Sequence, residues 1–164
     1  MNQTIRNIMK YILWAYPYKN ELSASRVTKM LYLVDWKCAI ERSAQLTDAK
    51  WYFNHYGPYV PDFMEIAEND DDIVIKNDET MFGGKKRLIC LSSKFTPVPL
   101  GAYEKSLVDF VIDKTQSKNY DDFIKLVYST YPVLTSNKYS KLDLIASAQS
   151  YKEVLADRNR LAKA

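Results

Sequence analysis

Apolar residues recur three or four positions apart at the start of the chain, and this spacing predicts an amphipathic helix. The positions that share its apolar face are Ile5, Ile8, Met9, Ile12, Leu13 and Tyr16. Pro17 ends this helix, because the proline ring removes a backbone donor and clashes with the preceding turn.

A second helix begins near Ser23 or Ser25, since either side chain can cap its first turn. Its apolar positions extend almost completely around the helix: Val27, Met30, Leu31, Tyr32, Leu33, Val34, Trp36, Cys38 and Ile40. This pattern is typical of a central helix, and we expect Leu31 and Trp36 in the core. Asp35 lies in the middle of the pattern, where burial is unfavourable unless the carboxylate has a partner.

The helical pattern stops after Arg42, and an aromatic segment follows. Five aromatic residues occur within nine positions: Trp51, Tyr52, Phe53, Tyr56 and Tyr59. Gly57 and Pro58 predict a tight turn, because glycine adopts backbone conformations that other residues resist, so the segment cannot be a plain helix. We expect the tryptophan and the phenylalanine to pack between the central helix and a later hairpin, whereas the three tyrosines are candidates for an exposed binding surface.

The second half of the chain carries three more helical patterns. One begins near Tyr103, a second is capped by Asn119, and a third spans about 143–160. The second of these should end before Tyr131-Pro132, because a residue that precedes proline is disfavoured in the α region.

Two short β-type runs flank a pair of glycines at residues 83–84, and they predict a small hairpin at about 73–91. A short helical stretch at 62–68 precedes this hairpin. The predicted fold class is therefore mainly α (α+β), with about six helices around a central apolar helix at about 25–42 and the one β-hairpin.

Composition and charge exclude several classes of protein. The chain has 164 residues, which is the size of one domain, and its 23 basic and 20 acidic side chains give a net charge of only +3. Such a small charge does not by itself indicate nucleic-acid binding. No stretch approaches the ~20 apolar residues of a membrane span, and the first residues do not resemble a signal peptide. Cys38 and Cys90 are far apart in the sequence, which leaves one long-range disulfide open as an alternative. The lack of a signal-peptide pattern favours a reducing compartment, so we expect a cytoplasmic protein.

Catalytic chemistry has little support in the sequence. The chain has one histidine, His55, and a histidine beside aromatic rings is more often structural than catalytic. The serines lack the pattern of a hydrolase nucleophile, and four glycines leave little material for a phosphate-binding loop. Two cysteines and one histidine do not provide the four close ligands of a structural zinc site. We therefore predict that this protein has no enzymatic activity, no cofactor and no metal site.

A DNA-binding transcriptional regulator with a winged-helix-like fold is the alternative. In that case the hairpin is the wing, and Lys85, Lys86 and Arg87 contact phosphates. A short basic run of this kind is more typical of a solvated loop, so the sequence does not favour nucleic acid as a partner.

Three segments that follow one another along the chain resemble the SocA-like antitoxins, whose shared module is the Panacea domain. They are residues 29–36 of the central helix, the turn at Leu46-Thr47, and residues 51–61, which close on Tyr-Gly-Pro-Tyr-Val-Pro. The family pattern usually has valine directly after Gly-Pro, where this chain has Tyr59. The resemblance covers about residues 3–135. The residues that carry the structural motif are Leu31, Tyr32, Asp35, Trp36, Trp51, Gly57, Pro58, Tyr131 and Pro132.

The resemblance implies an antitoxin of a type II toxin–antitoxin system, associated with phages or other mobile elements. Such a protein neutralises a toxin, encoded by an adjacent gene, by direct binding; some family members instead deliver the toxin to a protease. The family is not known for an enzymatic activity. Because protein interfaces favour aromatic anchors, we predict that the partner-binding residues are Tyr52, His55, Tyr56, Tyr59 and Asp62.

The domain organisation expected from these observations is a single domain over residues 1–164. It consists of the Panacea-like module at about 3–135 and a C-terminal helical extension at about 143–164. The extension lies outside the resemblance, which makes it a candidate for the choice of partner.

Overall fold

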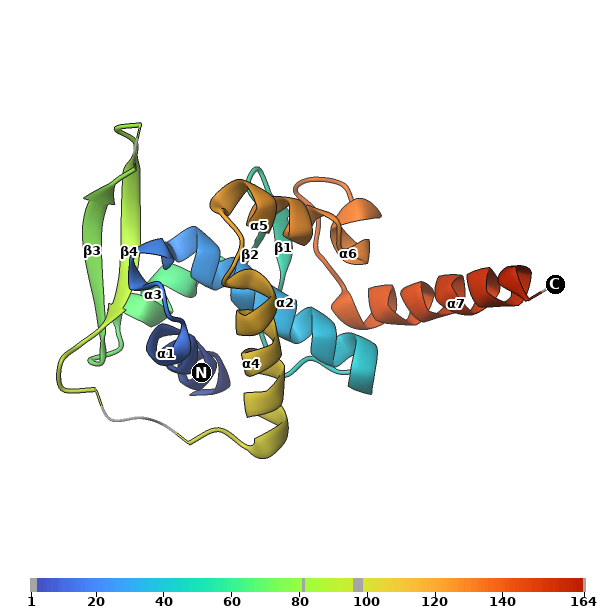
Figure 1. Ribbon diagram of the computed structural model, residues 1–164, viewed down its shortest axis with the longest axis horizontal. Helices are drawn as coiled ribbons and strands as arrows, with labels where there is room; N and C mark the ends of the chain where they lie inside the picture. The colour runs from blue at the N-terminus through green and yellow to red at the C-terminus, as the bar shows by residue number, and fades with distance from the viewer. Residues whose placement is uncertain (1–2, 81, 96–98, 164) are drawn as a thin grey trace.

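The computed structural model describes residues 3–80, 82–95 and 99–163, and these residues form a mainly helical fold, as predicted. One long helix crosses the centre of the molecule, and the other elements pack around it (Figure 1). The helices are α1 (Gln3–Ala15), α2 (Ala24–Arg42), α3 (Phe63–Glu68), α4 (Ala102–Thr115), α5 (Tyr120–Tyr128), α6 (Tyr131–Leu134) and α7 (Leu144–Ala162), with a 3₁₀ turn at Lys19–Glu21. The strands are β1 (Tyr52–Asn54), β2 (Gly57–Tyr59), β3 (Ile73–Glu79) and β4 (Lys85–Leu91).

The central helix is α2, and its position confirms the prediction from its apolar pattern. Every residue from Arg26 to Ala39 is buried except Lys37. The helix begins where expected, because the Ser23 hydroxyl oxygen accepts a hydrogen bond of 3.1 Å from the backbone N–H of Arg26. Burial on all sides removes a large apolar surface from water and makes α2 the support for its neighbours.

Asp35 is fully buried in the middle of α2 and has the partners that its burial requires. Its carboxylate accepts hydrogen bonds from the backbone N–H groups of Leu46 and Thr47, at 3.0 and 2.9 Å. It also accepts them from the Thr47 hydroxyl at 2.6 Å and the Trp51 indole at 2.9 Å. These four donors fasten the loop after α2 to the helix. Burial nevertheless raises the pKa of Asp35 to about 6, although the donors oppose this shift.

Arg26 is a second buried charge on α2, and it connects the central helix to α4 and α5. Its guanidinium donates to the carbonyl oxygens of Thr115 and Lys118, both at 2.9 Å. These carbonyls belong to the last residue of α4 and to the turn that follows it, where the helix dipole favours a positive charge. The guanidinium also lies 4.6 Å from the centroid of the Phe123 ring. The charge is therefore stabilised within the fold.

The predicted hairpin is present as β3 and β4, and a second hairpin, β1–β2, was not predicted. In β1–β2, Tyr52 pairs with Tyr59 and Asn54 pairs with Gly57. Each strand has only three residues, so the sequence shows no alternation long enough to reveal it. The backbone of Phe53 anchors the hairpin to the segment that precedes α7, through hydrogen bonds with the backbone of residues 139–140.

The C-terminal part differs slightly from the prediction. Helix α5 ends at Tyr128, before Tyr131-Pro132 as expected, but a short extra helix, α6, then begins at Tyr131. Pro132 is tolerated there because the first turn of a helix needs no N–H donor. Helix α7 starts against the body of the fold and extends beyond it (Figure 1). None of the helices described combines the length and apolar character required to cross a membrane.

Candidate functional site

A groove with a volume of about 450 Å³ lies between the first turns of α2, the β1–β2 hairpin, the start of α3 and the start of α5. We call it the hairpin groove. Its lining residues are Ala24, Ser25, Thr28, Lys29, Asn54, Tyr56, Tyr59, Val60, Pro61, Phe63, Met64 and Tyr120. The combination of apolar walls with a few polar groups is typical of a binding site.

The tip of the β1–β2 hairpin approaches α2 closely, and Gly57 makes this approach possible. The Asn54 side-chain oxygen accepts a hydrogen bond of 2.8 Å from the backbone N–H of Tyr56, which closes the turn. Gly57 has φ of +106°, a conformation that residues with a side chain rarely adopt. A Cβ atom at Gly57 would lie 3.3 Å from the Tyr128 ring and 3.4 Å from the Cε atom of Lys29. The turn predicted at Gly57-Pro58 is therefore formed by His55 and Tyr56, while Gly57 and Pro58 begin strand β2. Glycine at position 57 suits the positive φ and the close packing that follow the turn.

Three tyrosines contribute to the hairpin groove. Tyr56 is 71% exposed, Tyr120 is 46% exposed, and Tyr59 is partly buried. In contrast, Trp51 and Phe53 are buried in the core, as the sequence analysis expected. The aromatic segment therefore divides into rings that are buried in the core, Trp51 and Phe53, and rings that are exposed or partly exposed at the groove, Tyr56 and Tyr59.

Lys29 is the only residue of the groove lining that carries a full charge at neutral pH, and it is only 4% exposed. Its ammonium donates a hydrogen bond of 3.0 Å to the Ser25 hydroxyl, which in turn lies 2.8 Å from the Tyr120 hydroxyl. Within the part of the chain that the structure describes, no carboxylate forms an ion pair with Lys29. Burial lowers the pKa of Lys29 to about 8.

The predicted partner-binding residues occupy different positions relative to the groove. Tyr56 and Tyr59 line it. Tyr52 lies outside the lining, but its ring packs against Tyr59 with a centroid distance of 6.0 Å. His55 is exposed at the hairpin turn and makes an edge contact with Tyr56 at 4.8 Å. Asp62 is partly buried at the start of α3 and makes no capping hydrogen bond with its side chain.

The sequence analysis did not identify Lys29 as a candidate site residue, although its position in the sequence is unusual. Like Asp35, it is a charged residue within an almost entirely apolar stretch of the central helix. A lysine in this setting can often extend its ammonium into water, so the pattern alone does not indicate burial. Only the fold shows that the hairpin tip covers it.

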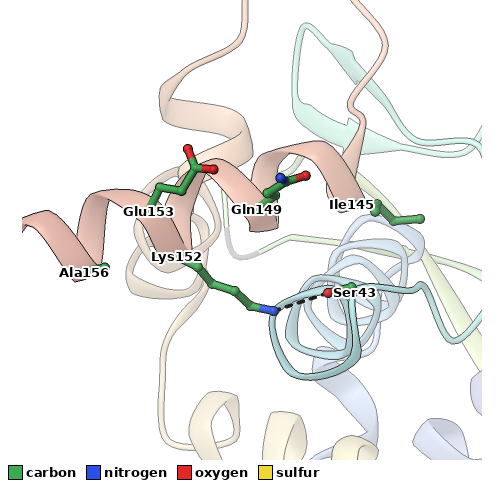
Figure 2. Close-up of a pocket in the computed structure, with 6 residues that line it drawn as sticks. All are labelled: Ser43, Ile145, Gln149, Lys152, Glu153 and Ala156. Atoms are coloured by element: carbon green, nitrogen blue, oxygen red, sulfur yellow. Dashed lines mark hydrogen bonds between the residues drawn. The ribbon is translucent and has the colours of Figure 1, made fainter.

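A second groove, with a volume of about 300 Å³, lies between α7 and the end of α2. Figure 2 shows its lining residues, with Lys152 of α7 extending across to Ser43 at the end of α2. The distance from the Lys152 ammonium to the Ser43 hydroxyl is 3.4 Å, and Lys152 and Glu153 are exposed. Charged side chains in this position are solvated, so this groove offers less to a partner than the hairpin groove does.

The groups that could support catalysis or metal binding are dispersed over the described residues. His55 lies outside the hairpin groove, and no hydrogen bond joins its ring to a carboxylate in the described ranges. Across residues 3–80, 82–95 and 99–163, no group of three or more histidine, cysteine or acidic side chains is placed to hold a metal ion. The hairpin groove itself presents aromatic faces, hydroxyl groups and one buried cation.

Comparison with known protein families gives one match. The family model described as "Antitoxin SocA-like, Panacea domain" matches residues 27–132, more than half of the chain. The matched part includes Lys29, the β1–β2 hairpin and Tyr120, whereas α1 and α7 lie outside it. No curated protein and no solved structure gives a significant match.

Proposed function

This chain belongs to the SocA-like antitoxin family with a Panacea domain, and we propose that it neutralises a partner toxin by direct protein–protein binding. In this proposal the two proteins form a type II toxin–antitoxin pair in the cytoplasm, encoded by adjacent genes and carried by a phage or another mobile element. The observation that carries it is the family match over residues 27–132. Delivery of the bound toxin to a protease is a variant of the same function.

The hairpin groove supports this function, because its surface has the composition of a protein interface. Tyrosine is enriched in the energetically important centre of interfaces, where it contributes a large rigid ring and one hydroxyl group. Tyr56 and Tyr120 are exposed in the groove lining, and Tyr59, which also lines the groove, is partly exposed and packs against Tyr52. We propose that a segment of the toxin lies in this groove, with His55 and Asp62 near its edges.

The alternative of a DNA-binding regulator has weaker support, because the basic residues of the β3–β4 hairpin have acidic neighbours. Lys86 is paired across the strands with Asp78, and Lys85 with Glu79. The Lys86 ammonium also donates a hydrogen bond of 2.7 Å to the backbone carbonyl of Asn20. A wing that binds phosphates needs an excess of positive charge, and this hairpin has little.

We propose a single domain in which α1 belongs to the antitoxin module, although the family match begins after it. Ile8, Met9 and Ile12 are completely buried, and the Tyr11 hydroxyl donates a hydrogen bond of 2.5 Å to Asp109 of α4. Helix α7 is then a C-terminal extension that buries Leu144 at its start and exposes most of its remaining length. Its exposed surface is a second candidate for the choice of partner.

The decisive experiment is the growth of cells that express the adjacent open reading frame, with and without this protein. We expect the adjacent product to be toxic alone and harmless in the presence of this chain. Tyr56→Ala should then weaken binding between the two purified proteins by roughly 1–4 kcal/mol if Tyr56 is a central contact.

Trp14→Ala is the matched control for this variant, because Trp14 is also an exposed aromatic residue, at 53%, but lies on α1 away from the groove. Its affinity for the partner should be unchanged. A harmless adjacent product, or toxicity that persists with the wild-type protein, would contradict the proposed function. Retention on heparin and binding to duplex DNA would be measured next, since DNA affinity falls steeply with salt.

A further inference from the structure

We propose that the hairpin groove receives the carboxylate of an aspartate or glutamate side chain of the partner protein, which forms an ion pair with Lys29. This inference rests on the proposed function, because it names the chemistry by which that partner is recognised. It goes further in predicting that the partner has an acidic side chain at the centre of its contact surface.

The first observation is that the Lys29 ammonium is buried with too few partners. An ammonium has three N–H donors, and within the described residues only the Ser25 hydroxyl accepts a hydrogen bond from it. The stem of the side chain is enclosed by the hairpin tip, since its Cε atom lies 3.4 Å from the Cβ position of Gly57. A buried charge without a counter-ion is unfavourable, and its low pKa, about 8, reflects this.

The second observation is that the surroundings of Lys29 favour an anion. The groove lining contains no aspartate or glutamate. Ala24 and Ser25, in the first turn of α2, line the groove at the end of the helix dipole that attracts negative charge. The acidic residues on the elements packed around it are Asp62, Glu65 and Glu68 near α3 and Asp121 and Asp122 on α5, and none of them forms an ion pair with Lys29 in the described structure.

The third observation is the mixed character of the groove, which identifies the kind of anion. Val60, Phe63 and Met64 supply apolar walls, and the tyrosines lie beside them. An acidic side chain has an apolar stem that can contact such walls and a compact carboxylate that can accept from Lys29, Ser25 and Tyr120. A phosphate group has more oxygen atoms to satisfy and no apolar stem, so a protein carboxylate fits these surroundings better.

The first test uses the free protein and does not need the toxin. The lysine side chains are isotopically labelled, and the pH midpoint of each ammonium group is measured by NMR. The titration is run with N-acetyl-glutamate N-methylamide, which carries a carboxylate, and separately with the neutral N-acetyl-glutamine N-methylamide, at equal ionic strength. We expect the glutamate compound to raise the pH midpoint of Lys29 and the glutamine compound to leave it unchanged. Lys76, exposed on β3, is the internal control and should respond to neither. Equal midpoints for Lys29 with both compounds would overturn the carboxylate site.

The second test measures the binding of the adjacent gene product to Lys29→Met and Lys29→Gln. We expect each variant to bind at least about tenfold more weakly, because the partner's carboxylate would be buried without its cation. Lys76→Met, which removes an exposed lysine of the same chain, should bind like the wild type. Unchanged affinity of both Lys29 variants would overturn the inference while the proposed function remained valid.

The proposed function and the proposed carboxylate site can therefore be contradicted independently of each other. If the adjacent product is harmless and does not bind, the proposed function is wrong, whereas the NMR titration still decides whether the groove accepts a carboxylate. If the product binds and is neutralised but the Lys29 variants retain full affinity, only the acidic anchor is wrong.

Discussion

Of the three buried charged residues on the central helix, Asp35 and Lys29 lie six residues apart and have opposite surroundings. Asp35 accepts four hydrogen bonds from the loop that follows α2, and every one of these donors belongs to the chain itself. Within the part of the chain that the structure describes, Lys29 makes one hydrogen bond, to the hydroxyl group of Ser25, and it lines an open groove. Burial shifts the pKa of both residues toward the neutral form, upward for Asp35 and downward for Lys29.

We infer from this difference that a structural charge and a charge for binding a partner can be distinguished by the hydrogen bonds that each makes within the fold. The hydrogen-bonding capacity of Asp35 is used within the fold, so its burial contributes to holding the loop in place. The capacity of Lys29 is mostly unused, so its burial weakens the free protein and can be compensated only from outside. Functional sites often carry such a cost in stability, which a partner then offsets on binding.

The largest effect should follow from the removal of the Asp35 carboxylate. In Asp35→Ala the indole of Trp51 and the donors of Leu46 and Thr47 lose their acceptor while they remain buried. Removing one partner from a buried, fully hydrogen-bonded charged group typically costs about 3–5 kcal/mol, and we expect the free energy of unfolding to fall by that amount. Denaturant unfolding followed by tryptophan fluorescence measures this loss.

Asp113→Ala is the control for this experiment, because Asp113 is exposed on α4. The control should change stability by less than about 0.5 kcal/mol. A loss of less than about 1 kcal/mol in Asp35→Ala would contradict the view that the four hydrogen bonds hold the loop.

Several elements of this contrast could be predicted from the sequence, because they depend on local patterns. The near-continuous apolar surface identified α2 as central, Ser23 was one of two predicted caps, and Asp35 was expected to need a partner. The partners themselves could not be predicted, since Leu46 and Thr47 reach Asp35 only through the path of an irregular loop. No periodicity describes such a path.

The groove was harder to predict than the core. Its lining combines the start of α2, the hairpin tip and Tyr120 of α5, which are far apart in the sequence. The aromatic segment did indicate exposed tyrosines, and of its three tyrosines Tyr56 is exposed, whereas Tyr52 and Tyr59 are partly buried. The burial of Lys29, however, depends on the approach of Gly57, which follows from a hairpin whose strands are too short to be recognised in the sequence.

An intermediate effect should follow from Gly57→Ala, which tests whether the hairpin tip keeps Lys29 buried. The alanine would have an unfavourable φ, and its Cβ would contact the Tyr128 ring and the Lys29 stem. We expect a loss of about 1–3 kcal/mol in the free energy of unfolding. The pKa of Lys29, measured by NMR, should rise toward its ordinary value as the displaced hairpin admits water.

Gly83→Ala is the matched control, because Gly83 also has a positive φ, +81°, but no described atom lies within 4 Å of its Cβ position. This control should show the backbone cost alone and leave the pKa of Lys29 unchanged. Equal losses in the two variants, together with an unchanged Lys29 pKa in Gly57→Ala, would show that the hairpin tip does not enclose Lys29.

The smallest effect should have the opposite sign, since removing Lys29 should stabilise the free protein. Lys29→Met keeps the length of the side chain but removes a buried charge, and we expect a gain of about 1 kcal/mol at neutral pH. Because the folded-state pKa, about 8, lies below the ordinary value of 10.5, the unfolded chain binds more protons between these values. The stability of the wild type should therefore rise with pH across this window, and that rise should be absent from the variant. Thermal unfolding at pH 7 and pH 10 measures both effects, with Lys76→Met as the control.

If Lys29→Met were instead less stable than the wild type at pH 7, Lys29 would be a structural charge like Asp35, and the contrast between the two residues would disappear.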